Sequence, residues 1–383
     1  MLLVFTAPTT STSSRTGAAG NAPEDRRRLV LAELERRLPA SAVRRPSAPE
    51  PTLHRLACVA HDAGLVSFLD RAWGEWSAVW ADAVRSGAVA KLQGVFALQE
   101  PGARADAASP PPLVAGFAAP RHDGAQLASD SSVLSQACYY AMDKETPIHA
   151  STAPTIKWDL AITRDAVHAV LSRETRVAYA QITHPGHHAG PSSYGGFCFV
   201  NHAAVAARLL QRDFARVAVV DVDFHAGNGT MAAFWGDASV LFASLHADPL
   251  HDYPFTAGFA GQAGPPPPHP AHGTTLNVPL PGGTAWPAYR AKLLEVVARC
   301  KRFGAEALVV SLGVDTLRGD IVAITGFELD PPDFLEMGRI LLDGASGGLA
   351  LPTVVVQEGG YLLSDVPAAV ANFLIGGRGG GML

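Results

Sequence analysis

A run of apolar residues that ends in Asp-Phe-His constrains this chain more than any other feature. Residues 217–222, VAVVDV, are rich in β-branched side chains and lead into Asp223, Phe224 and His225. Such a run is typical of a parallel strand that is buried on both faces. Side chains at positions i and i+2 of a strand point the same way, so Asp223 and His225 should project together from its carboxyl end.

Three further runs of the same kind occur in the chain, each followed by polar residues. They are residues 177–183, 307–315 and 353–357. Helical patterns lie at residues 201–213, 287–303, 331–343 and 365–375. Buried strands that alternate with helices predict a parallel sheet covered by helices on both faces. The sequence shows no internal repeat and no linker between two domains, so we predict one α/β domain.

The polar residues after these runs favour a catalytic metal site. Ligands of α/β sheets bind at the carboxyl ends of the strands. Asp223 and His225 offer one carboxylate and one imidazole there, and Asp315 ends another run. Two oxygens and one nitrogen leave a position of tetrahedral zinc free for water and substrate. The structural alternative is that an Asp at a strand end caps the next helix.

Two more clusters carry groups that are useful in catalysis. His187 and His188 lie in a loop bounded by Pro and Gly, where they could share the duties of base and acid or be solvated. Residues 358–361 read Glu-Gly-Gly-Tyr. Two glycines permit a sharp turn that brings the Tyr361 phenol inward, where its O–H can donate to an oxyanion. The alternative is a surface aromatic at a strand-to-helix turn.

The chain resembles the histone deacetylase and acetylpolyamine amidohydrolase superfamily, and within it the acetylpolyamine amidohydrolase branch. The motifs that carry the resemblance are HPGHHAG at 184–190, YGGFCFVNHAAVAA at 194–207, DVDFHAGNGT at 221–230, SLHADP at 244–249, YPFTAGFA at 253–260, SLGVDTLRGD at 311–320 and QEGGY at 357–361. They occur in family order, and several motifs in one order are more specific than any one alone. The resemblance implies the single-domain arginase/deacetylase fold, with a parallel central sheet and helices on both faces.

The resemblance also implies roles for the residues around the predicted metal. As zinc ligands it implies Asp223, His225 and Asp315. As catalytic residues it implies His187, His188, Tyr361, Asp221 and Asn228. We expect His188 to be the general base and His187 its electrostatic partner. Asp221 and Asn228 would then accept hydrogen bonds from the pair and fix the orientation of both rings. Iron could replace zinc in such a site.

The family also has a tunnel for the acyl group and a potassium ion near the zinc. Gly196 and Phe197 match residues that line the tunnel. The matching potassium ligands are Asp221, Ser244 and Leu245. Long loops shape the tunnel mouth and the dimer contacts in this family, so a homodimer is a further expectation.

Several positions depart from the family pattern. His184 replaces the first proline of a pair before the tandem histidines, and we expect it to face solvent. His202 replaces an asparagine and is expected to cap the following helix. Leu134 stands where we align an acidic residue of the tunnel mouth, and Asp123 and Asp130 have no certain alignment there. Without such carboxylates, specificity for a cationic amine weakens.

The chain divides into three predicted segments. Residues 1–27 are a first strand and a flexible segment, residues 28–376 are the catalytic domain, and residues 377–383 are a Gly-rich tail. A cytoplasmic location is expected, because four scattered cysteines without a Cys-X-X-Cys pair fit a reducing compartment. The alternative is an organellar transit segment, since residues 9–27 are rich in Ser, Ala and Arg and have no acid before Glu24.

Composition excludes two classes of partner. A net charge of −5 gives no basic footprint for nucleic acid, and no apolar run reaches the length of about 18 residues that a membrane span needs.

From the motifs and the predicted metal site, we predict a zinc-dependent amidohydrolase that removes acetyl or a similar small acyl group from polyamines or other amines. Alternatives are a protein acetyl-lysine deacetylase, a weak homologue that binds acylated ligands, and an arginase-like dimanganese hydrolase, which needs further Asp and His ligands.

Overall fold

The computed structural model describes most of the chain. The described residues are 2–7, 23–93, 95–96, 109–115, 127, 131–343 and 347–377. Most of the predicted flexible segment, residues 378–383 of the predicted tail, Asp123 and Asp130 lie outside these ranges.

The elements alternate between strands and helices along most of the chain. The strands are β1 (Leu2–Thr6), β2 (Val43–Arg44), β3 (Val177–Gln181), β4 (Val217–Asp221), β5 (Val240–Ala247), β6 (Thr275–Leu280), β7 (Ala307–Leu312) and β8 (Thr353–Gln357). The α-helices are α1 (Pro23–Arg37), α2 (His54–Ala57), α3 (Ala63–Ser86), α4 (Val133–Tyr140), α5 (Thr152–Leu171), α6 (His202–Leu210), α7 (Asn228–Phe234), α8 (Trp286–Phe303), α9 (Asp333–Gly338) and α10 (Val366–Gly376). Short 3-10 turns are η2 (Ala40–Ala42) and η3 (Val89–Lys91), and a π-helical turn, η4 (Arg339–Asp343), follows α9. Among the described residues, we find no helix with the length and apolar character that a membrane crossing requires.

The eight strands form one parallel sheet, in the order β2-β1-β3-β8-β7-β4-β5-β6. This confirms the predicted parallel sheet. The four runs that carry the candidate site residues are β3, β8, β7 and β4, which are neighbours in the middle of the sheet. Their carboxyl ends therefore lie side by side, although the runs are far apart in the sequence.

Helices cover both faces of the sheet, as predicted. Along β4, Val217 and Val219 belong to a buried cluster shared with α3, α5 and α6. The alternate residues Ala218 and Val220 belong to a second cluster shared with α1, α8, α9 and α10. This alternation follows from the period of a strand, and it explains why the run is apolar at every position.

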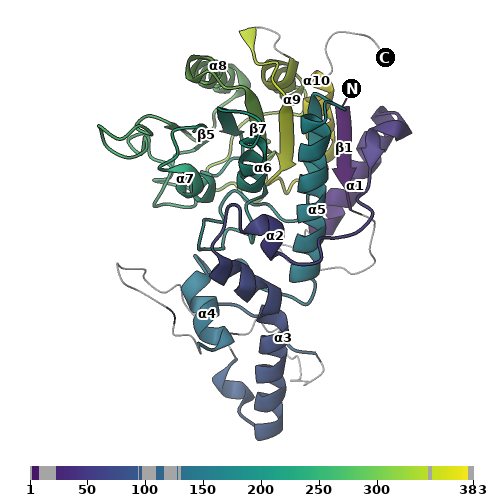
Figure 1. Cartoon of the computed structure of the whole chain (residues 1–383), viewed down its shortest axis with the longest axis vertical. Helices are drawn as coiled ribbons and strands as arrows, with labels where there is room; N and C mark the ends of the chain where they lie inside the picture. The colour runs from purple at the N-terminus through teal and green to yellow at the C-terminus, as the bar shows by residue number, and fades with distance from the viewer. Residues whose placement is uncertain are drawn as a thin grey trace.

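Helices α3 and α4 lie together at the end of the molecule opposite α8 and α10 (Figure 1). Trp76 and Trp80 of α3 are buried, and Trp76 donates its indole N–H to the carbonyl oxygen of Pro111 at 2.7 Å. After α4 the chain returns to the sheet region, where Ala141 forms a β-bridge with Tyr194. This return brings residues 143–146 to the candidate site.

The expectation that His202 caps α6 is wrong. The cap is Asn201, whose side-chain oxygen accepts from the backbone N–H of Ala204 at 2.8 Å. The short amide side chain reaches this N–H from the capping position. His202 is the first residue of the helix, and its buried ring lies 3.0 Å from the hydroxyl oxygen of Thr163.

Candidate active site

Three buried side chains from two strand ends converge to form the deepest part of the site. Asp223 and His225 follow β4, and Asp315 follows β7, the strand that pairs with β4. One ligand atom of each lies within 4.8 Å of the others. His225 Nδ1 is 3.3 Å from Asp223 Oδ1 and 3.1 Å from Asp315 Oδ2. The structure thus brings together the three residues that the sequence predicts as metal ligands.

The donor chemistry of this cluster suits a divalent metal ion. Two carboxylates and one imidazole leave a coordination position open, as catalytic zinc requires. Burial, with the charge of Asp223, raises the pKa of Asp315 to about 7. Burial opposes a charged imidazole, yet hydrogen bonds to Asp223 and Asp315 raise the pKa of His225 to about 10. A bound dication would keep both carboxylates ionised. Within the described ranges, no second cluster of this kind is found.

A glycine after β8 closes one side of the cluster. The backbone N–H of Gly359 donates to Asp223 Oδ2 at 2.9 Å. A Cβ at this position would lie 2.5 Å from Asp315 Oδ2 and 2.7 Å from Asp223 Oδ2. Only glycine permits this close approach of the backbone to the carboxylates.

The tandem histidines have different hydrogen-bond partners. His187 Nδ1 lies 3.0 Å from Asp221 Oδ2, whereas His188 Nδ1 lies 2.7 Å from Asn228 Oδ1. Burial opposes charge on both rings, but Asp223 and Asp221 raise the pKa of His187 well above its ordinary value. Burial and the charge of His187 lower the pKa of His188 well below its ordinary value. One imidazole therefore favours the charged form and its neighbour the neutral form.

Sequence reasoning missed the residue that holds the histidine loop. Glu358 is buried at the end of β8, and its Oε2 accepts from the backbone N–H groups of Gly186 and His187 at 2.6 and 3.2 Å. Ser311 of β7 donates its hydroxyl to the other oxygen at 3.0 Å. The signal was present, because Glu358 directly follows a buried strand.

Tyr361 reaches the pocket through a turn at Gly360, which has a φ of 122°. Its backbone N–H donates to Asp320 Oδ2 at 2.7 Å, and its ring meets the Phe197 ring edge-on at 5.9 Å between centroids. The guanidinium of Arg26, from α1, lies 5.7 Å from the centre of the phenol ring. Burial raises the pKa of Tyr361 well above its ordinary value, so the hydroxyl keeps its proton.

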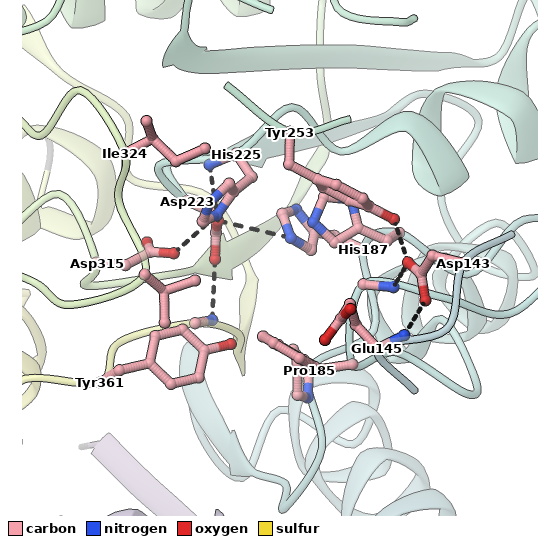
Figure 2. A pocket seen from close by; sticks show the side chains of 15 residues that line it. Asp143, Glu145, Pro185, His187, Asp223, His225, Tyr253, Asp315, Ile324 and Tyr361 are labelled. Carbon is pink, nitrogen blue, oxygen red and sulfur yellow. Dashed lines mark hydrogen bonds and ion pairs between the residues drawn. The ribbon is translucent and has the colours of Figure 1, made fainter. Parts of the chain in front are cut away.

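Two aromatic rings line the pocket next to the tandem histidines. Phe197 has a φ of 65° and follows Gly196, whose φ is 57°. Tyr253, which the sequence did not single out, lines the pocket and meets the His188 ring edge-on at 4.8 Å between centroids. In Figure 2 the Tyr253 hydroxyl points toward Asp143.

Two acidic residues besides Asp223 and Asp315 line the pocket, Asp143 and Glu145, and the sequence patterns singled out neither. Leu134 lies in α4, packs against the hydrophobic core and does not line the pocket. The carboxylates that line the pocket in this region therefore come later in the chain than residue 134, at Asp143 and Glu145. Glu145 is exposed, and no hydrogen bond or ion pair of its carboxylate is found among the described residues.

The expectation that His184 faces solvent is wrong. Its side chain is buried and meets the Phe199 ring edge-on, with the ring centroids 5.1 Å apart. Its Nδ1 is 4.0 Å from Asp159 Oδ2, and among the described residues neither ring nitrogen has a hydrogen-bond partner. Burial, with the charge of Arg26, lowers the pKa of His184 to about 3, so the ring is neutral.

The residues predicted to bind potassium lie on neighbouring strands. Asp221 ends β4 directly opposite Ser244 of β5, and Leu245 follows. All three are buried. The Ser244 hydroxyl lies 2.7 Å from His246 Nδ1.

Comparisons with known proteins show the family to which the chain belongs. Residues 22–376 match the family described as the histone deacetylase domain. The acetylpolyamine amidohydrolase of Mycoplana ramosa is 35% identical over 332 residues, which cover 86% of this chain and 85% of that protein. Histone deacetylase 4 of Caenorhabditis elegans is 36% identical over 197 residues, 50% of this chain and 22% of that protein. A crystal structure of the acetylpolyamine aminohydrolase of Burkholderia pseudomallei superposes with a TM-score of 0.77 at 27% identity, covering 99% of this chain and 100% of that one.

These findings define the class of protein, which is a hydrolytic deacetylase with a parallel α/β fold. More narrowly, the chain belongs to the histone deacetylase family, and its similarity to acetylpolyamine amidohydrolases extends over most of its length. Both the resemblance inferred from the motifs and the predicted fold are thereby confirmed.

Proposed function

We propose that this deacetylase is zinc-dependent and removes an acetyl or similar small acyl group from acetylated polyamines. The observation that carries the proposal is the convergence of the Asp-His-Asp cluster, the tandem histidines and Tyr361 on one pocket. When zinc is bound, the chemistry that it supplies is polarisation of the amide carbonyl and acidification of water. Asp223, His225 and Asp315 would hold it.

His188 is the general base in this proposal. An amide oxygen only accepts hydrogen bonds, so its contact with Asn228 Oδ1 means that Nδ1 of His188 donates. Nε2 then carries the lone pair that takes a proton from the attacking water. His187, whose Nδ1 contacts Asp221, is the electrostatic partner, and one of the two rings finally protonates the leaving amine.

Tyr361 is the donor to the developing oxyanion. Its phenol keeps its proton because burial raises its pKa. The turn at Gly360 and the hydrogen bond from the Tyr361 backbone N–H to Asp320 fix the backbone of this residue. The position of the hydroxyl follows from that backbone. Such a preformed donor stabilises the tetrahedral intermediate more than the ground-state carbonyl. Gly196 and Phe197 line the acyl tunnel, and the proposal includes potassium at Asp221, Ser244 and Leu245.

The carboxylate of Glu145 supports a cationic amine as the leaving group. It stands at the pocket without a hydrogen bond or ion pair of its own among the described residues, so it is free to meet an ammonium group. In Figure 2 Glu145 and Asp143 lie on one side of the pocket, and Tyr361 and Asp315 lie on the other. The names of the Mycoplana and Burkholderia relatives point to the same substrate class.

A second candidate substrate, acetyl-lysine in peptides, is favoured by a different feature of the rim. Phe255 and Ile324 are exposed at 50% and 68%, and Ile324 also lines the pocket. Apolar surface beside a tunnel suits the flanking residues of a peptide.

The test is hydrolysis of acetylspermidine, acetylputrescine, acetylcadaverine and an acetyl-lysine peptide by metal-loaded protein, with Asp315→Ala as the control. Turnover of the free amines but not of the peptide supports the proposal. Turnover of the peptide alone replaces it with a protein deacetylase. No turnover of any of the four, with tight binding of a hydroxamate, would indicate a homologue that only binds acylated ligands.

A further inference from the structure

The carboxylate of Asp143 accepts four hydrogen bonds from three segments of the chain. Its Oδ2 accepts from the backbone N–H of Gly196 at 2.6 Å and from the Tyr253 hydroxyl at 2.7 Å. Its Oδ1 accepts from the backbone N–H of Glu145 at 2.9 Å and from the Thr146 hydroxyl at 3.3 Å. A carboxylate has about four acceptor sites, so Asp143 has none left for a substrate.

Two of these four donors belong to groups that contact the imidazole of His188. A Cβ at Gly196 would lie 2.4 Å from His188 Cδ2, so the Gly196 backbone lies directly against the ring. The Tyr253 ring meets the same imidazole edge-on, with centroids 4.8 Å apart and an interplanar angle of 85°. One oxygen of Asp143 therefore accepts from both neighbours of this histidine. Figure 2 shows the bond from the Tyr253 hydroxyl.

The backbone at residues 196–197 depends on this support. Both residues have positive φ, and for Phe197 this conformation costs on the order of 1 kcal/mol or more. Thr146 Oγ1 accepts from the backbone N–H of Phe197 at 2.8 Å and donates its own proton to Asp143. Asp143 and Thr146 together keep the strained turn in place, with Phe197 in the tunnel wall.

We propose that Asp143 is a positioning residue for catalysis, which acts through Gly196 and Tyr253 to fix the orientation of His188. The proposal rests on the proposed function only in taking His188 as the base. Asn228 holds the imidazole at Nδ1, and the contacts that Asp143 maintains hold the rest of the ring. The distance between Nε2 and the attacking water is thereby fixed, and an error of about 1 Å there costs about 100-fold in rate.

A rival explanation is that Asp143 attracts a cationic substrate by its charge. The two explanations differ in which kinetic constant changes. Loss of attraction raises KM for a charged amine and leaves a neutral acetyl amide unaffected. If the His188 imidazole loses its correct position, kcat falls on both substrates, because the base is misplaced whichever amine leaves.

The first test uses Asp143→Asn and Tyr253→Phe, with Lys144→Gln as an exposed control from the same segment. In Asp143→Asn an NH2 group replaces one acceptor oxygen, so donors on that side lose their partner. We expect kcat to fall about 10- to 100-fold on an acetylated polyamine and on a neutral N-alkylacetamide, with KM changed less than about threefold. Tyr253→Phe removes one hydroxyl and should lower kcat about 3- to 10-fold. Lys144→Gln should match the wild type. A rise in KM confined to the charged substrate overturns the proposal.

The second test is a double-mutant cycle with His188→Ala. If Asp143 acts through His188, adding Asp143→Asn to His188→Ala lowers kcat less than about twofold further. A full multiplicative loss means that Asp143 supports the fold alone, which overturns the proposal. Should Asp143→Asn fail to fold, the same cycle with Tyr253→Phe decides the question. If the wild type cleaves only acetyl-lysine peptides, the proposed substrate fails, and both tests are run on the peptide with unchanged criteria.

Discussion

The deep end and the mouth of the pocket are built in different ways. The deep end consists of Asp223, His225 and Asp315, which follow paired central strands and are all buried. The mouth consists of Glu145 and Ile324, which come from segments between the regular elements, as do Asp143 and Tyr253 beside His188. Strand ends are fixed by the sheet, whereas connecting segments vary at little cost to the fold. We therefore expect the reaction to depend on the deep end and the choice of amine to depend on the mouth.

The largest effect should follow from removing a residue of the deep end. Asp315→Ala takes away one of two carboxylates from the metal cluster and is expected to lower kcat/KM about 1000-fold or more, since a bound metal is worth several kcal/mol to the transition state. Metal content per chain should fall in parallel, as measured by elemental analysis. Asp330→Ala, an exposed carboxylate nearby in the chain, is the control. Retained activity with retained metal would remove Asp315 from the ligand set.

Tyr361→Phe tests the reaction itself without changing Asp223, His225 or Asp315. Loss of one oxyanion donor usually costs about 100-fold or more in kcat. The variant keeps the ring that packs against Phe197, so the fold and the binding of a hydroxamate should stay close to those of the wild type. Unaltered turnover of an acetyl amide would exclude the proposed role of the hydroxyl.

Glu145→Gln tests the mouth and should have a smaller effect of a different kind. Removing a charge that meets an ammonium group is worth about 1 kcal/mol, so KM for an acetylated polyamine should rise about 3- to 10-fold. The increase should shrink at high salt, because the carboxylate is exposed to solvent. Steady-state kinetics at two salt concentrations measure both effects. A fall in kcat of the size expected for Tyr361→Phe would break the division between mouth and deep end.

His184 belongs to neither end, and its replacement should affect stability alone. The folded protein lowers the pKa of this ring to about 3 from an ordinary value of 6.5. As the pH falls below 6.5, the unfolded chain binds a proton there and the folded chain does not, so stability falls by about 1.4 kcal/mol per pH unit. His184→Leu removes this contribution. Between pH 7 and pH 5 the variant should therefore lose about 2 kcal/mol less unfolding free energy than the wild type.

Urea unfolding of both proteins at the two pH values measures this difference. An equal loss in wild type and variant would show that His184 does not stay neutral in the fold. His184→Asn, which keeps a polar group at the site without a titrating ring, is the matched control and should follow the leucine variant in its pH dependence.

Sequence patterns predicted the deep end and failed at the mouth, for a physical reason. A buried parallel strand is recognised in the sequence by its apolar run, and the residues after it must lie at the carboxyl edge of the sheet. That logic located Asp223, His225 and Asp315. It did not give the strand order, which decides that β3, β8, β7 and β4 are neighbours. Tyr253 lies 110 residues from Asp143, and nothing local predicts a hydrogen bond across that separation.

The two wrong expectations concern single histidines. His184 and His202 are polar residues beside Pro, Asn or Gly, where local patterns favour exposure or capping. Their burial depends on partners that come from elsewhere in the chain, the Phe199 ring for one and the Thr163 hydroxyl for the other. Domain limits, the cytoplasmic location, the homodimer and the bound ions stay predictions.

The place of β8 in the sheet has a consequence for how the chain reaches its active form. It is the last of the eight described strands in chain order, yet it pairs with β3 on one side and β7 on the other. Without β8, this strand order would leave β2-β1-β3 and β7-β4-β5-β6 as two separate groups, each with an unpaired edge at its inner strand. Open edges of this kind invite pairing with other chains. A chain that stops short of residue 353 lacks Tyr361 and keeps both open edges, so we expect it to be inactive and prone to aggregate.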